Sequence, residues 1–507
     1  MTWHAWLPVL TLLSSLVPGL VIFALPERSF RTRTTLNLAG ASIKLVFVTL
    51  IARGLLAGED FTSVLPLGAG LDLVLHADNL SVLFALLSAV LWFFSTIYAI
   101  GYLEGSPNRS RFFGFYSLCV SSTVGVAFAG NLLTFFFFYE ALALATYPLV
   151  VHRGTAASLD AGRVYLGYTL FGSALLLAGV LWLRSLAGPV PFVPGGSLPA
   201  TALAHRGDLV WIFLILVAGL GVKAALVPLH GWLPVAMIAP APVSALLHAV
   251  AVVKAGAFGL IRLVNDVFGA GALVAIGVER VLPTVAAVTI LWGSVRALGQ
   301  TRLKRLLAYS TVSQLSYVAL GTSLLGVTAS VGGLVHLVHQ GLMKITLFFC
   351  AGNLAETLGI QEIRDMKGVG RRMPLTMIAF TACALGMIGI PPLAGFVSKW
   401  YLALGGLETG RPWVIAVLVA STLLNAAYFL PIIYSVWFGT PDRPWRGSSA
   451  HPTAGEPAAR PWWGETGPLL VWPTVAVALL ATGAGLFANA PFSPLAWAKF
   501  IVSGGGP

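Results

Sequence analysis

The chain has 507 residues, of which 57% are hydrophobic and 9% charged, and its net charge is +12. Soluble domains carry about 25% charged residues, so this composition excludes an ordinary soluble protein and predicts an all-α polytopic membrane protein. The three cysteines lie far apart, and no phosphate-binding glycine motif is present. We therefore expect no nucleotide, no iron–sulfur cluster, no metal and no other cofactor in this chain.

Long apolar segments follow one another along the whole sequence. Because a membrane span needs about 20 apolar residues, we predict about 14 transmembrane helices. We expect the first apolar segment to be a span rather than a removed signal peptide. The expected helices lie near residues 6–25, 36–57, 79–103, 113–130, 132–151, 164–184, 209–229, 241–264, 281–298, 305–325, 328–353, 374–405, 412–437 and 466–488.

Arginine and lysine gather in the loops after the odd-numbered helices. These basic loops lie at residues 28–33, 109–111, 153–163, 302–305, 364–372 and 443–460. The positive-inside rule then places these loops in the cytoplasm and both termini on the outer side of the cell (inner or plasma) membrane. This topology accounts for the basic net charge, so nucleic acid is not needed as a partner.

One acidic residue, Glu140, lies deep inside an apolar helix, after the run Phe-Phe-Phe-Phe-Tyr. Acidic and basic residues are expensive inside a membrane and often mark ion pathways. A structural ion pair is the alternative for Glu140. We expect it to take part in ion translocation.

The segment 217–264 combines basic residues with helix-breaking prolines. Lys223 precedes Pro228 by five residues, and His248 and Lys254 follow in the next helix. A mid-membrane lysine costs roughly 3 kcal/mol on insertion scales. Desolvation favours the neutral form of a lysine, as a proton carrier requires, and Pro228 frees backbone carbonyls one turn back. The alternatives are that Lys223 snorkels to the interface and that His248 is a packed core residue.

The expected helix 328–353 carries a polar stripe. His336, Gln340 and Lys344 are spaced by four residues and share one face, with His339 beside them. The His-x-x-His pair could suggest a metal, but no third ligand accompanies it. The stripe is more typical of a hydrated ion path.

A second helix break lies at Pro391 and Pro392, followed by Lys399 about 175 positions after Lys223. Two broken helices with lysines suggest a duplicated half, and five helices in each half would make the two repeats inverted. The expected organisation is three N-terminal helices in 1–110, a first repeat in 111–265, a second repeat in 279–438, a cytoplasmic loop in 439–463 and a C-terminal helix in 464–507.

Four stretches resemble the antiporter-like membrane subunits that respiratory complex I, Mrp-type cation/proton antiporters and energy-converting hydrogenases share. They read KAALVPLHGWLPVAMIAPAPVSALLHAVAVVKAG, LKRLLAYSTVSQLSYVALG, GLVHLVHQGLMKITLFFCAGNL and GIPPLAGFVSKWYLALG. HAVAVVKAG and GFVSKWYLALGGLE most resemble the D-type members of Mrp antiporters. Many members have WLPDA where this chain has Val235, and some have His where it has Gln340, so an entry carboxylate at Val235 is in doubt.

The resemblance implies roles for the polar residues of the expected helices. Glu140 and Lys223 match a pair whose separation tunes proton release, because an opposite charge favours the protonated lysine. Lys399 matches a terminal lysine near the outer exit. The remaining positions match connecting groups, so the expected order of the route is Lys223 and His248, Lys254, His336, His339, Lys344 and Lys399.

The resemblance also implies partners. We expect other membrane subunits of a hetero-oligomeric complex, with protons and either Na⁺ or K⁺ as the transported ions. Three identities stay open: a cation/proton antiporter subunit, a proton-pumping part of an NADH:quinone oxidoreductase or membrane-bound hydrogenase, and a proton-channel partner of an inorganic-carbon uptake complex. Any redox chemistry would belong to other subunits, so whether the chain counts as part of an enzyme stays open too.

Overall fold

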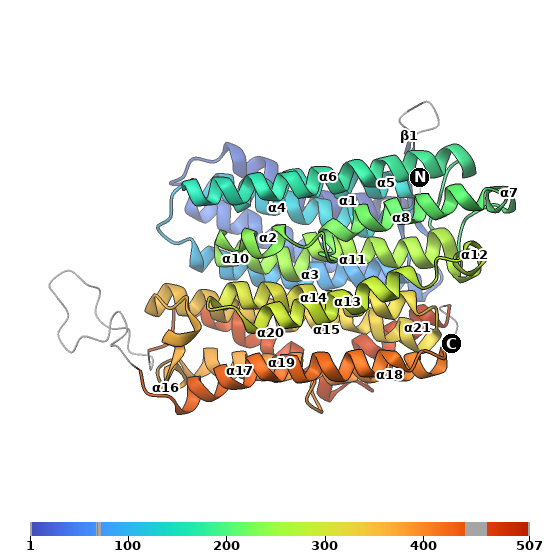
Figure 1. Ribbon diagram of the computed structural model, residues 1–507. Helices are drawn as coiled ribbons and strands as arrows, with labels where there is room; N and C mark the ends of the chain where they lie inside the picture. The colour runs from blue at the N-terminus through green and yellow to red at the C-terminus, as the bar shows by residue number, and fades with distance from the viewer. Residues whose placement is uncertain (1–2, 67, 69–71, 442–463, 505–507) are drawn as a thin grey trace, which may run out of the picture.

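The computed structural model describes residues 3–66, 68, 72–441 and 464–504. Its helices run side by side along one common direction (Figure 1). Ten helices in these described ranges are long and apolar enough to cross a membrane. The expected all-helical polytopic architecture is confirmed, whereas the number of 14 spans stays a prediction.

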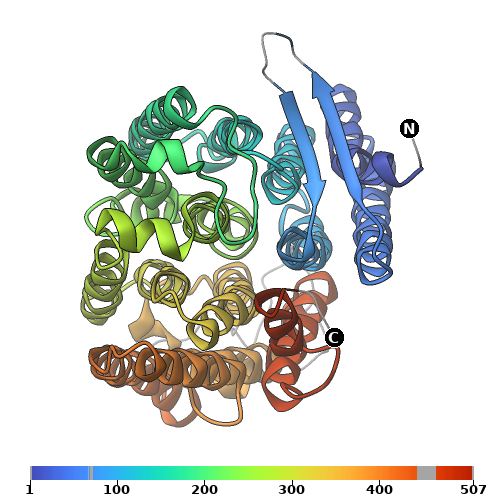
Figure 2. The ribbon, with the colours of Figure 1, turned by 90° about the vertical axis from the view of Figure 1, so that its right-hand side faces the viewer.

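The N-terminal part holds three long helices and a hairpin. Its elements are α1 (Trp3–Ala24), α2 (Phe30–Leu56), β1 (Phe61–Pro66), β2 (Asp72–Ala77) and α3 (Asn79–Tyr102). The strands are antiparallel, with Phe61 opposite Ala77, and they lie across the ends of the neighbouring helices (Figure 2). The hairpin was not predicted, because two strands of six residues leave little periodic signal between long apolar segments.

The middle part begins with three uninterrupted helices and then becomes irregular. Its elements are α4 (Arg109–Ala127), α5 (Leu132–Val150), α6 (Ala156–Ala187), α7 (Ala200–Leu203), α8 (Arg206–Lys223), α9 (Trp232–Val235), η1 (Ala236–Ile238), α10 (Ala241–Ala245), η2 (Leu246–Val250), α11 (Val252–Arg262), η3 (Leu263–Phe268) and α12 (Gly269–Ile276). Side-chain caps begin the regular helices: Asn131 accepts a hydrogen bond from the Thr134 backbone N–H, and Thr155 from that of Ser158.

The last part contains the second broken helix. Its elements are α13 (Val281–Leu298), α14 (Leu303–Ser323), α15 (Val327–Leu358), η4 (Ile363–Met366), α16 (Val369–Arg372), α17 (Pro374–Ile388), α18 (Ala394–Glu408), α19 (Trp413–Phe438), α20 (Pro468–Leu486) and α21 (Pro494–Val502). The expected helix 374–405 is thus two helices. The division of the chain into two inverted repeats stays a prediction.

The centre of the bundle is formed by α15 and by the segment Ala241–Ile276, whose most apolar windows are completely buried. α15 packs against α14, α17, α18 and α20. Seen along the helices, α20 and α21 lie between the N-terminal helices and the last part of the chain (Figure 2). Every polar residue of α15 between His336 and Lys344 is therefore enclosed by protein rather than by lipid.

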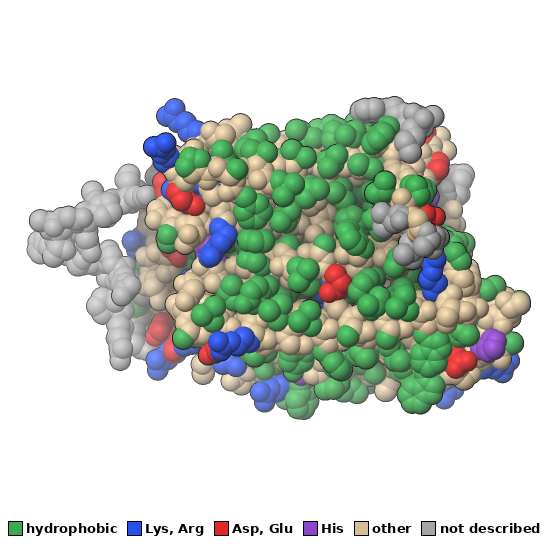
Figure 3. Space-filling model, turned by 90° about the horizontal axis from the view of Figure 1, so that it is seen from above, with side chains coloured by type: hydrophobic (Ala, Val, Ile, Leu, Met, Phe, Trp, Pro, Cys, Tyr) green, Lys and Arg blue, Asp and Glu red, His purple; other side chains and the backbone are tan. Residues whose placement is uncertain are grey.

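The two chain ends lie at the same end of the bundle, and α16 lies at the opposite end (Figure 1). Hydrophobic side chains cover the middle of the face in Figure 3, and most charged ones lie toward its two ends, as the hydrocarbon core of a membrane requires. Which end faces the cytoplasm stays a prediction. Most of the expected loop 439–463 lies outside the described residues.

Candidate functional site: buried cations across the bundle

Lys223 is the last residue of α8 and is 1% exposed. Its ammonium group donates a hydrogen bond to the carbonyl oxygen of Tyr139 in α5 and lies 3.3 Å from the centroid of the Tyr139 ring. An aromatic face attracts a cation through its quadrupole. The alternative that Lys223 snorkels to the interface is wrong, because its side chain is held inside the bundle.

Glu140 follows Tyr139 directly, so it lies beside the group that holds Lys223. Its carboxylate accepts a hydrogen bond from the Ser173 hydroxyl of α6 and forms no ion pair with Lys223. Glu140 is half-buried and shares a face of α5 with Leu144, which is 59% exposed. Glu140 and Lys223 are therefore near neighbours that are not in contact.

α8 ends at Lys223 because the chain turns there. Ala225 has a φ of 56°, in the left-handed region that ends helices, and Pro228 cannot continue the helix. The sequence predicts that this break frees carbonyl groups for water or an ion. The indole N–H of Trp232 donates to the carbonyl oxygen of Val222 at 2.7 Å, so a protein group already satisfies one of them.

A second irregularity, not predicted, interrupts the following helix. Residues 246–250 form the π-helical segment η2 between α10 and α11. Both ring nitrogens of His248, inside η2, are buried and have no hydrogen-bond partner in the described part of the chain. Its ring lies 4.5 Å from that of Phe348. π-helical segments frequently occur at functional sites, but nothing in the sequence LLHAV predicts one.

Lys254 in α11 is fully buried and reaches α15. Its ammonium group donates to the carbonyl oxygen of Leu337 at 2.6 Å and to the side-chain oxygen of Gln340. Gln340 is thus the direct partner of Lys254. α11 comes very close to the end of α8 at Gly256, where a Cβ would lie 2.3 Å from the backbone nitrogen of Ala224. Only glycine permits that approach, which brings Lys254 toward the α8 break.

The stripe predicted on α15 is completely buried. The Nδ1 atom of His336 lies 2.7 Å from the Ser398 hydroxyl of α18. The Lys344 ammonium group donates to the Ser310 hydroxyl of α14, also at 2.7 Å. Together with Gln340, these residues connect α15 to three neighbouring helices. The serine partners were missed, because a single serine in a span carries no signal of its own.

His339 lies beside this stripe, and neither of its ring nitrogens has a hydrogen-bond partner in the ranges that the structure covers. Among the described residues, no group of three or more histidines, cysteines and acids could hold a metal ion. The cysteines are buried and unpaired. Apart from the Glu140 carboxylate, the site is therefore built from titratable nitrogen atoms and neutral oxygen atoms.

The buried titratable residues follow a spatial order that the sequence could not supply. Lys344 lies within electrostatic range of His248 and of Lys254. His336 lies within range of Lys254 and of Lys399. The spatial order is therefore His248, Lys344, Lys254, His336 and Lys399, whereas the sequence predicts that Lys344 is followed directly by Lys399. We call these five residues, together with Lys223, the polar row.

Lys399 occupies the second broken helix, in the second turn of α18. Its ammonium group folds back onto the end of α17, where it donates to the carbonyl oxygens of Ile388 at 2.7 Å and Met387 at 3.3 Å. The Thr422 hydroxyl of α19 accepts a third hydrogen bond at 3.0 Å. The break at Pro391–Pro392 frees these carbonyls, so here the helix break itself holds the cation.

Arg262 is a buried cation that sequence reasoning did not single out. Its guanidinium group binds both oxygens of Asp78, at 2.7 and 2.8 Å, and Asp266 at 2.6 Å. Burial would raise the pKa of the Asp78 carboxyl, but the Arg262 charge and the hydrogen bonds from Arg262 and Ser81 lower it to about 2. This network joins η3 to the start of α3. In the sequence, the only indication of this network is the i, i+4 spacing of Arg262 and Asp266.

A further buried lysine lies outside the polar row. Lys44 in α2 is completely buried, and its ammonium group donates to the Ser15 hydroxyl of α1 at 2.6 Å. The same group lies 4.4 Å from the centroid of the Trp92 ring in α3. Lys44 was not among the predicted residues, because no helix break accompanies it.

Comparison with known families identifies this architecture. Residues 129–429 match the family described as "NADH:quinone oxidoreductase/Mrp antiporter, TM". Residues 66–113 match "NADH-Ubiquinone oxidoreductase (complex I), chain 5 N-terminus". Apart from Lys44, the lysines described above lie within the first of these matches.

Several curated proteins are similar to the chain. NADH-quinone oxidoreductase subunit N of Desulforudis audaxviator (strain MP104C) is 37% identical over 398 residues, which cover 76% of this chain and 77% of that protein. Subunit L of Mycobacterium tuberculosis (strain ATCC 25618 / H37Rv) is 31% identical over 83% of this chain, which spans 64% of that longer protein. The Na(+)/H(+) antiporter subunit A1 of Staphylococcus haemolyticus (strain JCSC1435) is 32% identical over 65% of this chain and 42% of that protein.

A solved structure has the same fold. A chain of the Mrp complex from Dietzia sp. DQ12-45-1b superposes with a TM-score of 0.81 at 22% sequence identity, covering 99% of this chain and 98% of that chain. At this identity the likeness concerns the fold alone.

Proposed function

We propose, from the premise that this chain belongs to the NADH:quinone oxidoreductase/Mrp antiporter family, that it is a proton-translocating subunit of a multi-subunit membrane complex. The observation that carries this proposal is the polar row. Each of its lysines is enclosed by the bundle and is held by carbonyl, hydroxyl or amide oxygens. Intramembrane ionisable residues of this kind mark ion pathways.

Contacts that are already formed support a route through the second half of the row. Lys254 hydrogen-bonds Gln340, which lies one helical turn from His336 in α15. His336 contacts the hydroxyl of Ser398, the residue that precedes Lys399. A proton released at Lys254 thus has polar groups at each step toward the carbonyl oxygens that hold Lys399.

Lys223 and Glu140 form the proposed control point at the end of α8, beside the helix that carries Lys254. An opposite charge favours the protonated form of a lysine. Approach of Glu140 would therefore hold the proton on Lys223, and withdrawal would release it toward Lys254. The Ser173 hydroxyl, which binds Glu140 in this arrangement, competes with Lys223 for the carboxylate.

The partly exposed position of Glu140 supports a complex rather than a chain that acts alone. An acidic side chain facing lipid near mid-membrane is unfavourable, and the neighbouring Phe137 and Leu144 on the same face are 51% and 59% exposed. We propose that another membrane subunit covers this face. Driven transport also needs such a partner, because moving one charge across 100 mV costs about 2.3 kcal/mol.

Two finer assignments remain candidates. The similarity to subunit N, which extends over three quarters of both chains, favours a proton-pumping subunit of a complex I-like oxidoreductase. The stretches HAVAVVKAG and GFVSKWYLALGGLE favour a D-type member of the monovalent cation/proton antiporters of Mrp type. Subunits that co-purify with the chain distinguish the two: redox subunits support the first assignment, and small hydrophobic antiporter subunits support the second.

The proposal is tested by Lys223→Met in the assembled complex, with proton flux measured in inverted vesicles. Methionine retains the length of the side chain and removes its charge. We expect flux to fall to background, a loss of about 100-fold or more, as is typical when an acid–base group is removed. Glu140→Gln should slow proton flux by about tenfold, because it removes the negative charge that acts on Lys223 but leaves Lys223 itself in place.

Lys44→Met is the matched control, because it removes a buried lysine of the same kind outside the polar row. It should assemble and transport as the unchanged protein does. Normal flux in a correctly assembled Lys223→Met complex would contradict the proposal. Loss of flux in both variants would also contradict it, since position in the row would then not matter.

A further inference from the structure

A cavity of about 360 Å³ opens at the end of the bundle that carries the basic loops. It lies between the irregular segment 234–238, which follows the α8 break, and the start of α14. Four of its lining residues are basic: Arg153 from the loop after α5, and Arg302, Lys304 and Arg305 at the start of α14. A cavity of this size holds a small ligand or a lipid headgroup.

These four cations lack fixed counter-ions. Among the described residues none of the four forms an ion pair with a carboxylate, unlike the surface residues Arg163 and Arg364. Two acids lie close to the cavity. The carboxylate of Glu356 is engaged by the Tyr102 phenol, and Glu362, which follows the lining residue Gln361, forms an ion pair with Arg364. The four basic side chains therefore outnumber these two acids around one partly open cavity.

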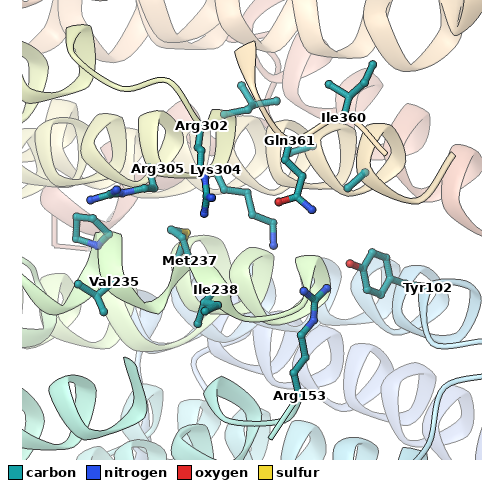
Figure 4. A pocket seen from close by; sticks show the side chains of 14 residues that line it. Tyr102, Arg153, Val235, Met237, Ile238, Arg302, Lys304, Arg305, Ile360 and Gln361 are labelled. Carbon is teal, nitrogen blue, oxygen red and sulfur yellow. The ribbon is translucent and has the colours of Figure 1, made fainter. Parts of the chain in front are cut away.

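The cavity also presents hydrogen-bond donors at an anchored position. The Lys304 side chain is steadied by a 2.7 Å hydrogen bond to the carbonyl oxygen of Ala239. Figure 4 shows Arg153, Lys304, Gln361 and Tyr102 pointing toward the same space from different elements. α14 begins at Leu303, so the positive end of its helix dipole lies at the same cavity.

We propose that this cavity binds a phosphate-bearing anion, either the headgroup of an anionic phospholipid or a soluble phosphate compound. Arginine forks and a lysine ammonium group around one space match the geometry and charge of phosphate oxygens. Basic pockets between membrane helices on the cytoplasmic side recognise lipid headgroups in this way. The proposal does not depend on the proton route, because it concerns a separate cavity and its own ligand.

The bound anion has a consequence for the polar row. Lys304 lies within electrostatic range of His248, the first histidine of the row. The excess of positive charge around this cavity repels cations and lowers their local concentration. An anion in the cavity cancels that barrier, so occupancy of the cavity should raise the supply of protons to His248. The site would thereby link transport to the lipid or phosphate content of its surroundings.

The test is a binding titration of the full-length chain, purified in detergent with the subunits that accompany it, by native mass spectrometry. The probes are dihexanoyl phosphatidylglycerol, dihexanoyl phosphatidylcholine and inorganic phosphate. We expect the double variant Arg153→Gln/Lys304→Gln to weaken phosphatidylglycerol binding at least tenfold. Arg28→Gln/Arg31→Gln is the matched control, because it removes two exposed cations from another basic loop. If the double variant does not fold, Arg153→Gln alone should weaken binding at least threefold.

The relative strength of binding of the three probes identifies the ligand or contradicts the proposal. Phosphatidylglycerol binding that is much tighter than phosphate binding identifies a lipid headgroup. Phosphate binding of equal strength identifies a soluble anion. The proposal fails if phosphatidylcholine binds as well as phosphatidylglycerol, if no probe binds, or if the cavity variants bind phosphatidylglycerol as tightly as the control does.

Discussion

The lysines of the polar row and Arg262 are all buried cations, but the protein holds them in opposite ways. Arg262 is clamped by the carboxylates of Asp78 and Asp266. Lys254 and Lys399, by contrast, are held by carbonyl, amide and hydroxyl oxygens only. A carboxylate partner fixes the charge of a buried cation, whereas neutral oxygens can hold an ammonium group or an amine. We therefore propose that the partner of a buried cation, rather than its burial, separates a structural cation from a proton carrier.

The Glu140–Lys223 pair lies between these two extremes. A carboxylate is nearby, yet it binds Ser173 and not the lysine. A small movement of the Glu140 side chain would switch it between binding Ser173 and pairing with Lys223. In the proposed route, the first broken helix would therefore switch and the second would release the proton, since Lys399 has no acidic group among its hydrogen-bond partners.

The sharpest test of the comparison is Lys399→Met. We expect proton flux in inverted vesicles to fall to background, a loss of about 100-fold or more, because the last carrier of the row is removed. The thermal stability of the assembled complex should be unchanged or higher, since an imperfectly compensated buried charge is lost. A clearly lower stability would instead indicate that Lys399, like Arg262, is a structural cation.

Asp78→Asn tests the structural side of the comparison. Breaking a buried ion pair costs about 3–5 kcal/mol, and because the Asp78 side chain is 24% exposed, we expect a loss of about 2 kcal/mol in denaturant unfolding. The pKa of Asp78 is about 2. Its contribution is therefore fully present above about pH 4 and is lost as pH falls through about 2. The difference between variant and unchanged protein should be equal at pH 5 and pH 8, and a difference that shrinks at pH 5 would contradict the pairing.

Gln340→Glu converts the neutral partner of Lys254 into a carboxylate of nearly the same shape. We expect proton flux to fall by about tenfold, because the added charge retains the proton on Lys254. Gln340→Met is the control, since it removes the hydrogen bond without adding charge. If the Gln340→Glu complex transports protons as fast as the unchanged protein, a carboxylate partner does not retain the proton on a buried lysine in this bundle.

Lys44→Met carries the smallest expected effect. Lys44 is held by a serine hydroxyl and a tryptophan ring, as a carrier would be, but it lies outside the row. We expect proton flux within twofold of the unchanged protein and stability unchanged or raised by about 1 kcal/mol. Loss of flux would contradict the proposed route, since a buried lysine outside the polar row would then matter as much as those within it.

Much of this protein could be predicted from its sequence. Apolar segments of about 20 residues have essentially one stable form in hydrocarbon, so the helical architecture follows from composition. The prolines at 228, 391 and 392 predicted both broken helices, because proline cannot continue the hydrogen-bonding pattern of an α-helix. The lysines stood out because charge is expensive inside a membrane. The family resemblance that rested on these residues is confirmed.

The partners of these residues could not be predicted. The π segment around His248, the contact between Lys254 and Gln340, and the return of Lys399 to the carbonyls of α17 all join or reshape elements by packing. The basic cavity brings together Arg153, from the loop after α5, and Lys304, from the start of α14, which are far apart in the chain. Sequence alone thus determined where the charges are and that helices surround them. Only the tertiary structure decided which charge meets a carboxylate and which meets a neutral oxygen, because that choice depends on which helix faces each side chain.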